Sequence, residues 1–391
     1  MIYLFVLLLR AVAYLEGPYK IASFAVVFSI MAYSTVKRSS ISYTKISKVN
    51  YYILLIVIAV IIHGSFFGTL LVRDVAVLIT YWIWFLFTFS FFKQKTIKES
   101  LKYILIAFLI YNVANYLFFE LNFGDQRLGY NSIMALMGIT GYRIYFPLSS
   151  GANVFTFQVG LNAILALYFI KNSSGKFKYF LAYAFCIFLL VLADSRLILL
   201  FTLAFSFVYY FSIKQIVKFI KSNWEFITLS IILVIFIFYK TSLFDSIKRP
   251  GELSGSALSR IDIWGYAFNA IFDDFHFLVG HGINGFENSH TDEIRRAFEN
   301  DNLQTAHNFF IQNIIDFGLL GLIIILFLLY KLLVMVVKIN SHIITILFVM
   351  FLLIGTTESI PTLYTFDSTI FFIALLSLII VNNERKVNRQ N

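Results

Sequence analysis

The sequence predicts an all-α polytopic membrane protein with about twelve transmembrane helices, and three observations lead to this fold class. First, 60% of the 391 residues are hydrophobic, and the mean hydropathy is +0.82. Second, only 13% are charged, about half of the roughly 25% that is usual in soluble domains. Third, apolar runs recur, most of them about long enough to cross the roughly 30 Å hydrocarbon core of a bilayer. They are too long and too uniformly apolar for the alternating strands of about ten residues that build a membrane β-barrel.

The linkers between the apolar runs alternate in charge, and this alternation sets the expected topology. Every second linker is rich in lysine, as the positive-inside rule requires of cytoplasmic segments. Twelve spans with both termini in the cytoplasm satisfy all six lysine clusters, so the net charge of +10 is an orientation signal and not the mark of a nucleic-acid partner. The clusters lie at 37–50, 93–102, 171–178, 214–221, 331–338 and in the C-terminal tail. The expected spans are 2–15, 21–36, 51–71, 75–92, 102–119, 152–170, 179–193, 197–212, 225–240, 309–330, 342–357 and 368–382.

The cations on the outward side are mostly arginines. Membrane orientation needs only positive charge, whereas guanidinium is preferred where paired hydrogen bonds must reach a phosphate or a carboxylate. The outward face therefore indicates a site for an anionic substrate, with ion pairs to neighbouring acids as the alternative for each arginine. The outward cations are Arg73, Arg127, Arg143, Arg196, Arg249, Arg260, Arg295 and Arg296 against Lys20, Lys240 and Lys248.

Three outward segments are unusual: a long loop at 120–151, a minimal turn "DSR" at 194–196, and the longest loop at 241–308. The last is short for an independent domain, so we expect one membrane domain over 1–391 with 241–308 lying over the site as a lid. Within that loop, apolar residues at helical spacing predict an amphipathic helix at 256–272. Its expected apolar face consists of Leu258, Ile261, Trp264, Ala267, Phe268 and Ile271.

Two further features of the long loop are expected. Thr291 and the acids that follow it predict a short helix over 291–300. The glycines of "VGHGINGF" at 279–286 indicate a tight turn whose backbone is closely approached.

Four residues at the outward ends of these segments are the candidates for chemistry. Arg143 precedes the sixth span, Arg196 begins the eighth, and Arg260 opens the amphipathic helix, so the three could converge on a phosphate. His307 lies where the long loop meets the tenth span, and an imidazole that exchanges its proton near neutral pH suits acid–base work. The alternatives are a local salt bridge of Arg196 with Asp194 and a purely capping role for His307.

Other kinds of site find no support. The chain has no HExxH motif and no cysteine cluster, so no metal is expected. It has no P-loop, so neither a nucleotide nor another cofactor is expected. A transferase that works on the outward side then needs a donor activated in another way, and a lipid-linked phosphate is the obvious choice.

Several segments of the sequence resemble the O-antigen polymerase and O-antigen ligase superfamily. The similarity lies in "SRIDIWGYAFNAIFDDFHFLVGHGINGF" followed by "AHNFFIQNIIDFGLLGLI", in "RIYFPLSSGANVFTF" and in "ADSRLILLFTLAF", which together cover roughly residues 120–325. Arg143, Arg196 and Arg260 match the arginines of the family pattern, and His307 with Asn308 matches its "HN" pair. The family's usual proline after the tryptophan motif is missing here, where "DDFHF" stands at 273–277.

The resemblance implies a GT-C-like, metal-independent, inverting glycosyltransferase of the bacterial inner membrane that uses undecaprenyl-pyrophosphate-linked oligosaccharides. We expect His307, Arg143, Arg196 and Arg260 to be catalytic, and Asn308, Arg127, Gly280 and Gly282 to contribute to substrate binding.

The favoured activity is a polymerase of O-antigen or capsular repeat units, with a chain-length regulator as a further partner beside the lipid bilayer. The alternatives are an O-antigen ligase, which transfers the chain to lipid A-core or another acceptor, and a flippase of lipid-linked sugars. A flippase should carry charges near the bilayer midplane. A polyprenyl-monophosphate transferase should carry an acidic pair in the first outward loop, where only Glu16 stands.

Overall fold

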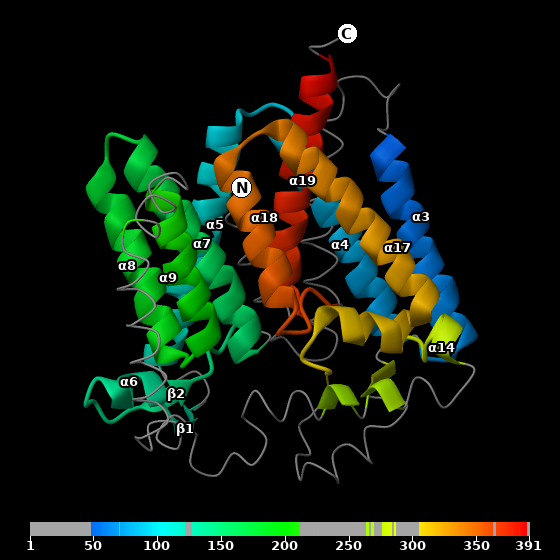
Figure 1. Ribbon diagram of the computed structural model, residues 1–391, viewed down its shortest axis with the longest axis horizontal. Helices are drawn as coiled ribbons and strands as arrows, with labels where there is room; N and C mark the ends of the chain where they lie inside the picture. Colours follow the sequence, from blue (N-terminus) through cyan, green and yellow to red (C-terminus); the bar gives the residue numbers. More distant parts are fainter. Residues whose placement is uncertain are drawn as a thin grey trace.

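The computed structural model shows a helical bundle (Figure 1) and describes residues 48–69, 71–121, 127–149, 151–211, 222, 263–265, 267–269, 276–283, 285–286, 305–362 and 365–388. The main helices of the bundle are α3 (Lys48–Phe66), α4 (Val72–Phe92), α5 (Ile97–Glu120), α7 (Ala152–Asn172), α8 (Lys176–Leu192), α9 (Arg196–Tyr210), α17 (Phe309–Ile339), α18 (His342–Gly355) and α19 (Phe366–Asn388). Two short helices, α6 (Ser132–Leu136) and α14 (His276–Val279), and two strands, β1 (Arg127–Tyr130) and β2 (Tyr142–Ile144), lie at one end.

Nine of the twelve expected spans fall on described residues, and each coincides with a helix. Within the described ranges, five helices are long and apolar enough to cross a membrane: Asp74–Phe92, Ile97–Glu120, Ala152–Asn172, Phe309–Ile339 and Phe366–Val387. The described part of the chain is thus that of an α-helical membrane protein. The expected spans at 2–15, 21–36 and 225–240, the Lys-rich linker at 37–50 and the expected helix at 291–300 lie largely or wholly outside the described residues.

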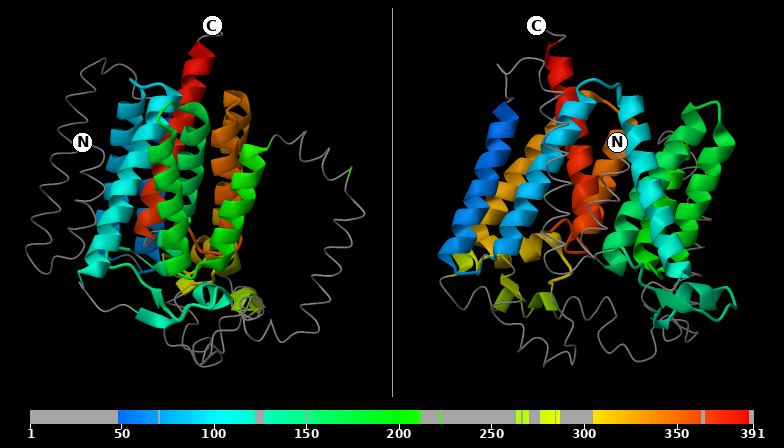
Figure 2. Two further views of the ribbon diagram at one scale, coloured as in Figure 1. Left: turned by 90° about the vertical axis from the view of Figure 1, so that its left-hand side faces the viewer. Right: turned by 180° about the vertical axis from the view of Figure 1, so that it is seen from behind.

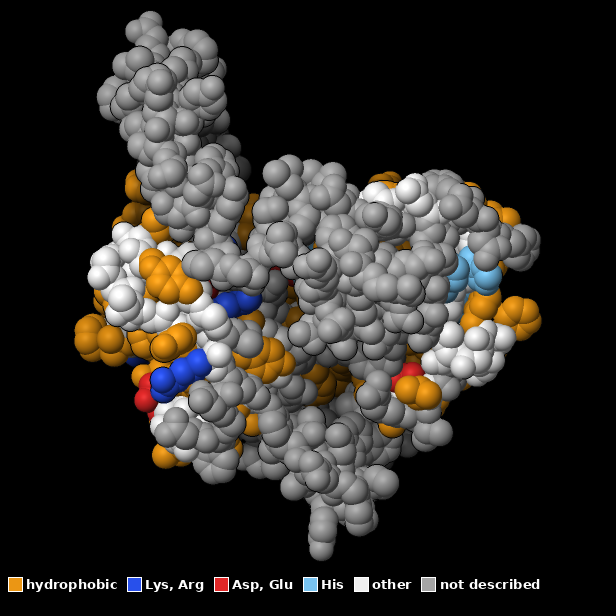
Figure 3. All heavy atoms as spheres, turned by 90° about the horizontal axis from the view of Figure 1, so that it is seen from below, with side chains coloured by type: hydrophobic (Ala, Val, Ile, Leu, Met, Phe, Trp, Pro, Cys, Tyr) orange, Lys and Arg blue, Asp and Glu red, His pale blue; other side chains and the backbone are white. Residues whose placement is uncertain are grey.

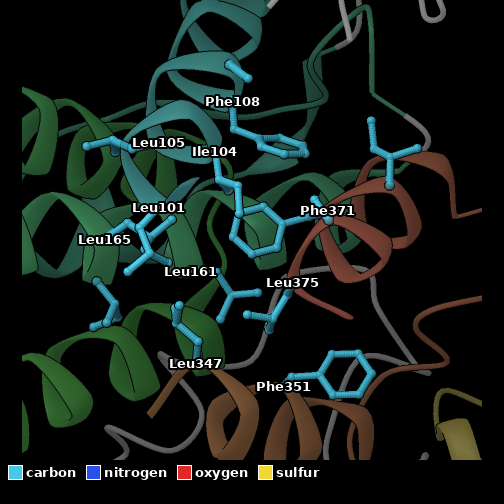
Figure 4. Close-up of a cluster of buried hydrophobic side chains, with 14 of the residues drawn as sticks. Leu101, Ile104, Leu105, Phe108, Leu161, Leu165, Leu347, Phe351, Phe371 and Leu375 are labelled. Carbon is cyan, nitrogen blue, oxygen red and sulfur yellow. The ribbon is translucent and has the colours of Figure 1, made fainter. Parts of the chain in front are cut away.

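Helix α7 is the centre of the bundle. It contacts α5, α8, α9, α18 and α19, and it is buried on all sides along 155–167. A helix with apolar residues all round must be enclosed by other elements or by lipid; here it is enclosed by helices. The core between α5, α7, α18 and α19 is built from aliphatic and phenyl side chains that interdigitate (Figure 4), among them Leu101, Ile104, Phe108, Leu161, Leu165, Leu347, Phe351 and Phe371.

The predicted loop at 120–151 contains structure that the sequence analysis did not foresee. Strands β1 and β2 pair antiparallel, with Leu128 opposite Arg143. Between them, Asn131 caps α6 and donates from Nδ2 to the carbonyl oxygens of Val191 and Leu192 at 2.8 and 3.1 Å. The hairpin is thereby attached to the end of α8, and in the views of Figure 2 it lies beneath the helices.

Helix α17 differs from the predicted span in two ways. It continues to Ile339, so the lysines of the expected linker 331–338 lie within it. It is also broken at Gly318, where φ is 65°. The break releases backbone carbonyl groups, and two of them are satisfied by the glycine-rich turn: His281 N donates to Ile315 O at 2.8 Å and Gly282 N to Asp316 O at 3.0 Å. A broken helix within a membrane protein needs such replacement partners.

The helix expected at 256–272 is only partly described, and its buried face agrees with the prediction at Ala267 and Trp264 but not at Phe268. Residues 263–265 and 267–269 are helical. Ile263 and Ala267 are buried, whereas Phe268 is 37% exposed. The prediction for Phe268 was wrong because Ile263 and Ala267, one turn apart, pack against Phe286 and the beginning of α17.

Candidate functional site

Arg143 is positioned by the hairpin and by two helices. It lies on β2, and its side chain crosses to the turn between α8 and α9 and to the start of α7. Its Nε donates to the carbonyl oxygen of Ala193 at 3.1 Å, and its Nη2 donates to Oδ1 of Asn153 at 2.9 Å. Two directed hydrogen bonds fix the plane of the guanidinium, which a lysine in the same place could not do.

Arg196 lies close to this point along the chain, since it is the first residue of α9 and follows Ala193 by three residues. The turn that carries it is held by its neighbours. Oδ2 and Oδ1 of Asp194 accept hydrogen bonds from Ser132 Oγ and Ile133 N, at 2.9 and 3.1 Å. Asp194 therefore anchors α6 to this turn, a role that the alternative of a local salt bridge with Arg196 did not include. The minimal turn predicted at 194–196 is present as predicted.

Asn308 builds the start of α17. Its side-chain oxygen accepts hydrogen bonds from the backbone N–H groups of Phe310 and Ile311, at 2.9 and 3.1 Å. Its own backbone N–H donates to Ser359 Oγ at 2.9 Å, and its Nδ2 donates to Thr356 O at 2.8 Å. Asn308 is thus an N-cap that also ties α17 to the loop between α18 and α19.

His307 precedes this cap in a left-handed backbone conformation, with φ of 48°. Few residues other than glycine adopt that conformation, and backbone strain of this kind is concentrated at functional sites. The residue before it is held from two sides: Ala306 O accepts from Trp264 Nε1 at 2.8 Å, and Ala306 N donates to Gln312 Oε1 at 3.0 Å. The tryptophan of the sequence motif therefore fixes the segment that carries His307.

Glu358 is the residue that the sequence analysis missed. It follows α18 and is only 7% exposed. Its Oε2 lies 3.4 Å from Nδ1 of His307, and its Oε1 accepts from Nδ2 of Asn153 at 3.0 Å. A carboxylate in this place can orient an imidazole and stabilise its protonated form, as acids do beside catalytic histidines. The only signal in the sequence was that Glu358 is one of two acids in a short outward linker, 358–367.

These contacts form one continuous chain, Arg143–Asn153–Glu358–His307, which joins β2, α7, the loop after α18 and the start of α17. Two of the four predicted catalytic residues, separated by more than 160 positions in sequence, are thus linked through two bridging side chains. One end of the chain is a cation able to hold an anion. The other is an imidazole–carboxylate pair able to accept a proton.

The remaining predicted residues are placed differently or lie outside the described part. Arg260 is among the residues that are not described. Arg127 is exposed and pairs with Ile144. Because successive strand residues point to opposite faces, this register puts Arg127 and Arg143 on opposite faces of the hairpin.

Gly280 and Gly282 do form the closely approached turn that the sequence indicates. A Cβ on Gly280 would lie 2.5 Å from the backbone of Asp316, and one on Gly282 would overlap the side chain of Thr69. What approaches them here is the protein's own chain.

This end of the molecule is seen from below in Figure 3, where Lys and Arg side chains lie toward one side and His side chains toward the other. His281 of the glycine-rich turn stacks on His276, the first residue of α14, with the ring centroids 4.4 Å apart.

Comparison with known proteins identifies one family. Residues 181–326 match the family model described as O-Antigen ligase. The match confirms the resemblance to the O-antigen polymerase and ligase superfamily over that range, which includes Arg196, Arg260 and His307. Arg143 and Glu358 lie on either side of it. No curated protein matches the chain.

Proposed function

We propose that this protein is a membrane glycosyltransferase that polymerises undecaprenyl-pyrophosphate-linked oligosaccharide repeat units into O-antigen or capsular polysaccharide. The observation that carries the proposal is the chain of contacts from Arg143 to His307, at the end of the bundle where α7, α9 and α17 begin. The family match over 181–326 supports the reaction class. The reaction is inverting and needs no metal.

The arginines act on the leaving group. As the bond between the anomeric carbon and the diphosphate oxygen breaks, its electron pair passes to that oxygen, and negative charge grows on the diphosphate. Arg143, Arg196 and Arg260 would hold this charge with guanidinium groups placed before the reaction begins. A donor aimed in this way lowers a transition-state barrier by about 3–4 kcal/mol.

His307 acts on the acceptor. It takes the proton of the attacking sugar hydroxyl while the new bond from that oxygen to the anomeric carbon forms, on the face opposite the departing diphosphate. Attack from the opposite face inverts the anomeric centre. Glu358, 3.4 Å from the imidazole, balances the positive charge that His307 gains.

The membrane placement belongs to the same proposal. The alternating lysine clusters put both termini in the cytoplasm of a bacterial inner-membrane protein of about twelve GT-C-like spans, with the site facing outward. Residues 241–308 would lie over the site, and Asn308 would serve it by holding the start of α17. Arg127, on the opposite face of the hairpin from Arg143, and Gly280 and Gly282, packed against the protein's own chain, are not part of the proposed site.

A ligase that transfers finished polysaccharide to lipid A-core or another acceptor is the second candidate, because the matching family model carries that description. Both activities need the same cations and base. We favour the polymerase because members of that class share only a skeletal motif pattern, as this chain does.

The two functions separate in one assay. Purified protein is incubated with a single synthetic undecaprenyl-pyrophosphate-linked repeat unit, and the products are resolved by gel electrophoresis. A ladder of polymers is expected of a polymerase. If the unit remains single, even with a chain-length regulator present, and is transferred only when lipid A-core is supplied, the protein is a ligase. A His307→Ala variant present at normal level but with full activity would refute both.

A further inference from the structure

Arg143 and His307 would serve opposite halves of the reaction, and the inference that follows rests on that proposed function. Arg143 would hold the departing diphosphate, and His307 would take the proton of the attacking hydroxyl. Between them lie Asn153 and Glu358, each in contact with its neighbours on both sides. We propose that Asn153 and Glu358 are positioning residues that couple diphosphate binding at Arg143 to proton binding at His307.

The carboxamide of Asn153 can serve this bridge in one orientation only. Its oxygen accepts from Arg143 Nη2 at 2.9 Å, and its nitrogen donates to Glu358 Oε1 at 3.0 Å. A half-turn of the amide would aim its N–H group at the guanidinium, which has only donors, and its oxygen at the carboxylate, which has only acceptors. The two hydrogen bonds also reinforce each other, because a donor that polarises the amide oxygen makes the amide N–H a better donor. A change in the hydrogen bond from Arg143 to Asn153 therefore changes the strength of the hydrogen bond from Asn153 to Glu358.

Glu358 divides its two oxygens between the two sides. The distance from Oε1 to Asn153 is 3.0 Å, whereas that from Oε2 to His307 is 3.4 Å, so the carboxylate lies closer to the amide than to the imidazole. It is buried, so few water molecules can replace a partner that it loses. A carboxylate that is held less firmly by hydrogen bonds binds a proton or a cation more strongly. A weaker hold by Asn153 thus strengthens the pairing of Glu358 with a protonated His307.

A diphosphate competes with Asn153 for Arg143. The guanidinium is already held at Nε by Ala193 O, and Nη2 is the group shared with Asn153. A phosphate oxygen carries charge and is a stronger acceptor than an amide oxygen. When Nη2 turns to the phosphate, the amide becomes a poorer donor to Glu358. The carboxylate of Glu358 then pairs more strongly with a protonated His307. The base becomes stronger once the donor substrate is in place.

The coupling is reciprocal, because two ligands that affect each other's binding do so by the same factor in both directions. If bound diphosphate favours the protonated imidazole, then the protonated imidazole favours bound diphosphate. Diphosphate affinity should therefore rise as the pH falls across the range in which the imidazole takes up its proton. Among the described residues, the charged groups that these contacts bring to His307 are Glu358, from the loop after α18, and Arg143, from β2. Arg143 keeps its charge throughout this range.

The experiment measures binding of a prenyl methyl diphosphate diester, in which each phosphate keeps one negative charge over this range, to the full chain in nanodiscs. Affinities are compared at about pH 5.5 and about pH 8.5, on either side of the ordinary imidazole value. We expect the wild-type protein to bind at least about fivefold more tightly at the lower pH, within the usual range of coupling between sites. Asn153→Ala and Glu358→Gln should bind the probe but reduce this ratio toward one. Tyr183→Phe, which removes a hydrogen bond between α8 and α9 to Ser206 and touches none of the four residues of the bridge, should keep the wild-type ratio.

Two kinds of failure are distinguishable. If Arg143→Ala binds the probe as well as wild type does, the proposed function loses its phosphate-holding residue. If Arg143→Ala loses the probe while Asn153→Ala and Glu358→Gln both keep the full wild-type ratio, the proposed function stands and the bridge is refuted. A wild-type ratio of one also refutes the bridge.

Discussion

Replacing Arg143 by lysine tests whether the site needs a shaped cation or only a positive charge. The guanidinium makes two directed hydrogen bonds, to Ala193 O at 3.1 Å and to Asn153 Oδ1 at 2.9 Å, which fix the orientation of its plane. A lysine ammonium is a single point donor and can replace at most one of them in the same direction. Loss of one hydrogen bond that involves a charged group costs about 1.5–3 kcal/mol.

If the lost interaction acts in the transition state, that energy lowers the rate about tenfold to about 150-fold. The assay is the initial rate of polymer formation from a synthetic lipid-linked repeat unit, at saturating donor and per amount of folded protein. The matched control is Arg385→Lys. Arg385 also donates to backbone carbonyl groups, those of Phe92, Lys93 and Lys95, but it lies near the C-terminal end of α19. The control variant should be less stable than the wild-type protein but should form polymer at the wild-type rate. A wild-type rate of polymer formation in Arg143→Lys would refute the reasoning.

Three further substitutions follow from the described contacts, each checked in detergent-solubilised protein. Trp264→Phe removes the N–H that holds Ala306, a loss of about 1 kcal/mol. The polymerisation rate should fall, whereas the melting temperature should change little. Gly318→Ala should destabilise the fold by more than about 1 kcal/mol in thermal unfolding, since φ is positive there and a Cβ would overlap the backbone of Leu278 and Val279 in α14. Gly265→Ala meets open space and should be neutral. Gly160→Leu should force α7 and α9 apart and lower the free energy of unfolding by about 1–3 kcal/mol. A melting temperature equal to that of the wild-type protein would count against close packing at this position.

The helices were the part of the structure most open to prediction from the sequence. Apolar runs of membrane length identify helices wherever they occur, because a backbone in lipid must satisfy its hydrogen bonds within the segment. Their ends were less predictable. The span that begins at Phe309 was expected to end at residue 330, but the helix runs on to Ile339. Lysine is a good helix former and reaches out of the apolar layer along its own stem, so Lys331 does not end a helix.

The break in α17 shows what local sequence leaves open. A glycine inside an apolar run is usually a small residue in a continuous helix. Gly318 leaves the helical conformation because another segment, the turn at 279–285, supplies donors to the carbonyl groups that the break sets free. That partner lies more than 30 residues away in sequence. The glycines of the turn were correctly expected to be closely approached, but the identity of the approaching group depends on tertiary structure.

The candidate site was likewise predictable from the sequence only in part. Arg143 and His307 could be chosen as candidates from the sequence because cations on the outward side and an imidazole at a helix start are unusual in their local context. Asn153 and Glu358 are not unusual locally: asparagine near a helix start and an acid in a linker are common. They gain a role only because α7 and the loop after α18 bring them together, 205 positions apart in sequence.

The arrangement also explains why two separate polar segments converge at the end of an apolar bundle. A cation that binds a diphosphate and a base that removes a proton must not neutralise each other before the substrate arrives, so a direct ion pair between the arginine and the acid beside the histidine would defeat both. Asn153 stands between the two charged side chains. It is neutral, and it accepts from Arg143 while donating to Glu358. Through the amide, the two opposite charges are joined by hydrogen bonds and not by direct contact with each other in this chain of contacts.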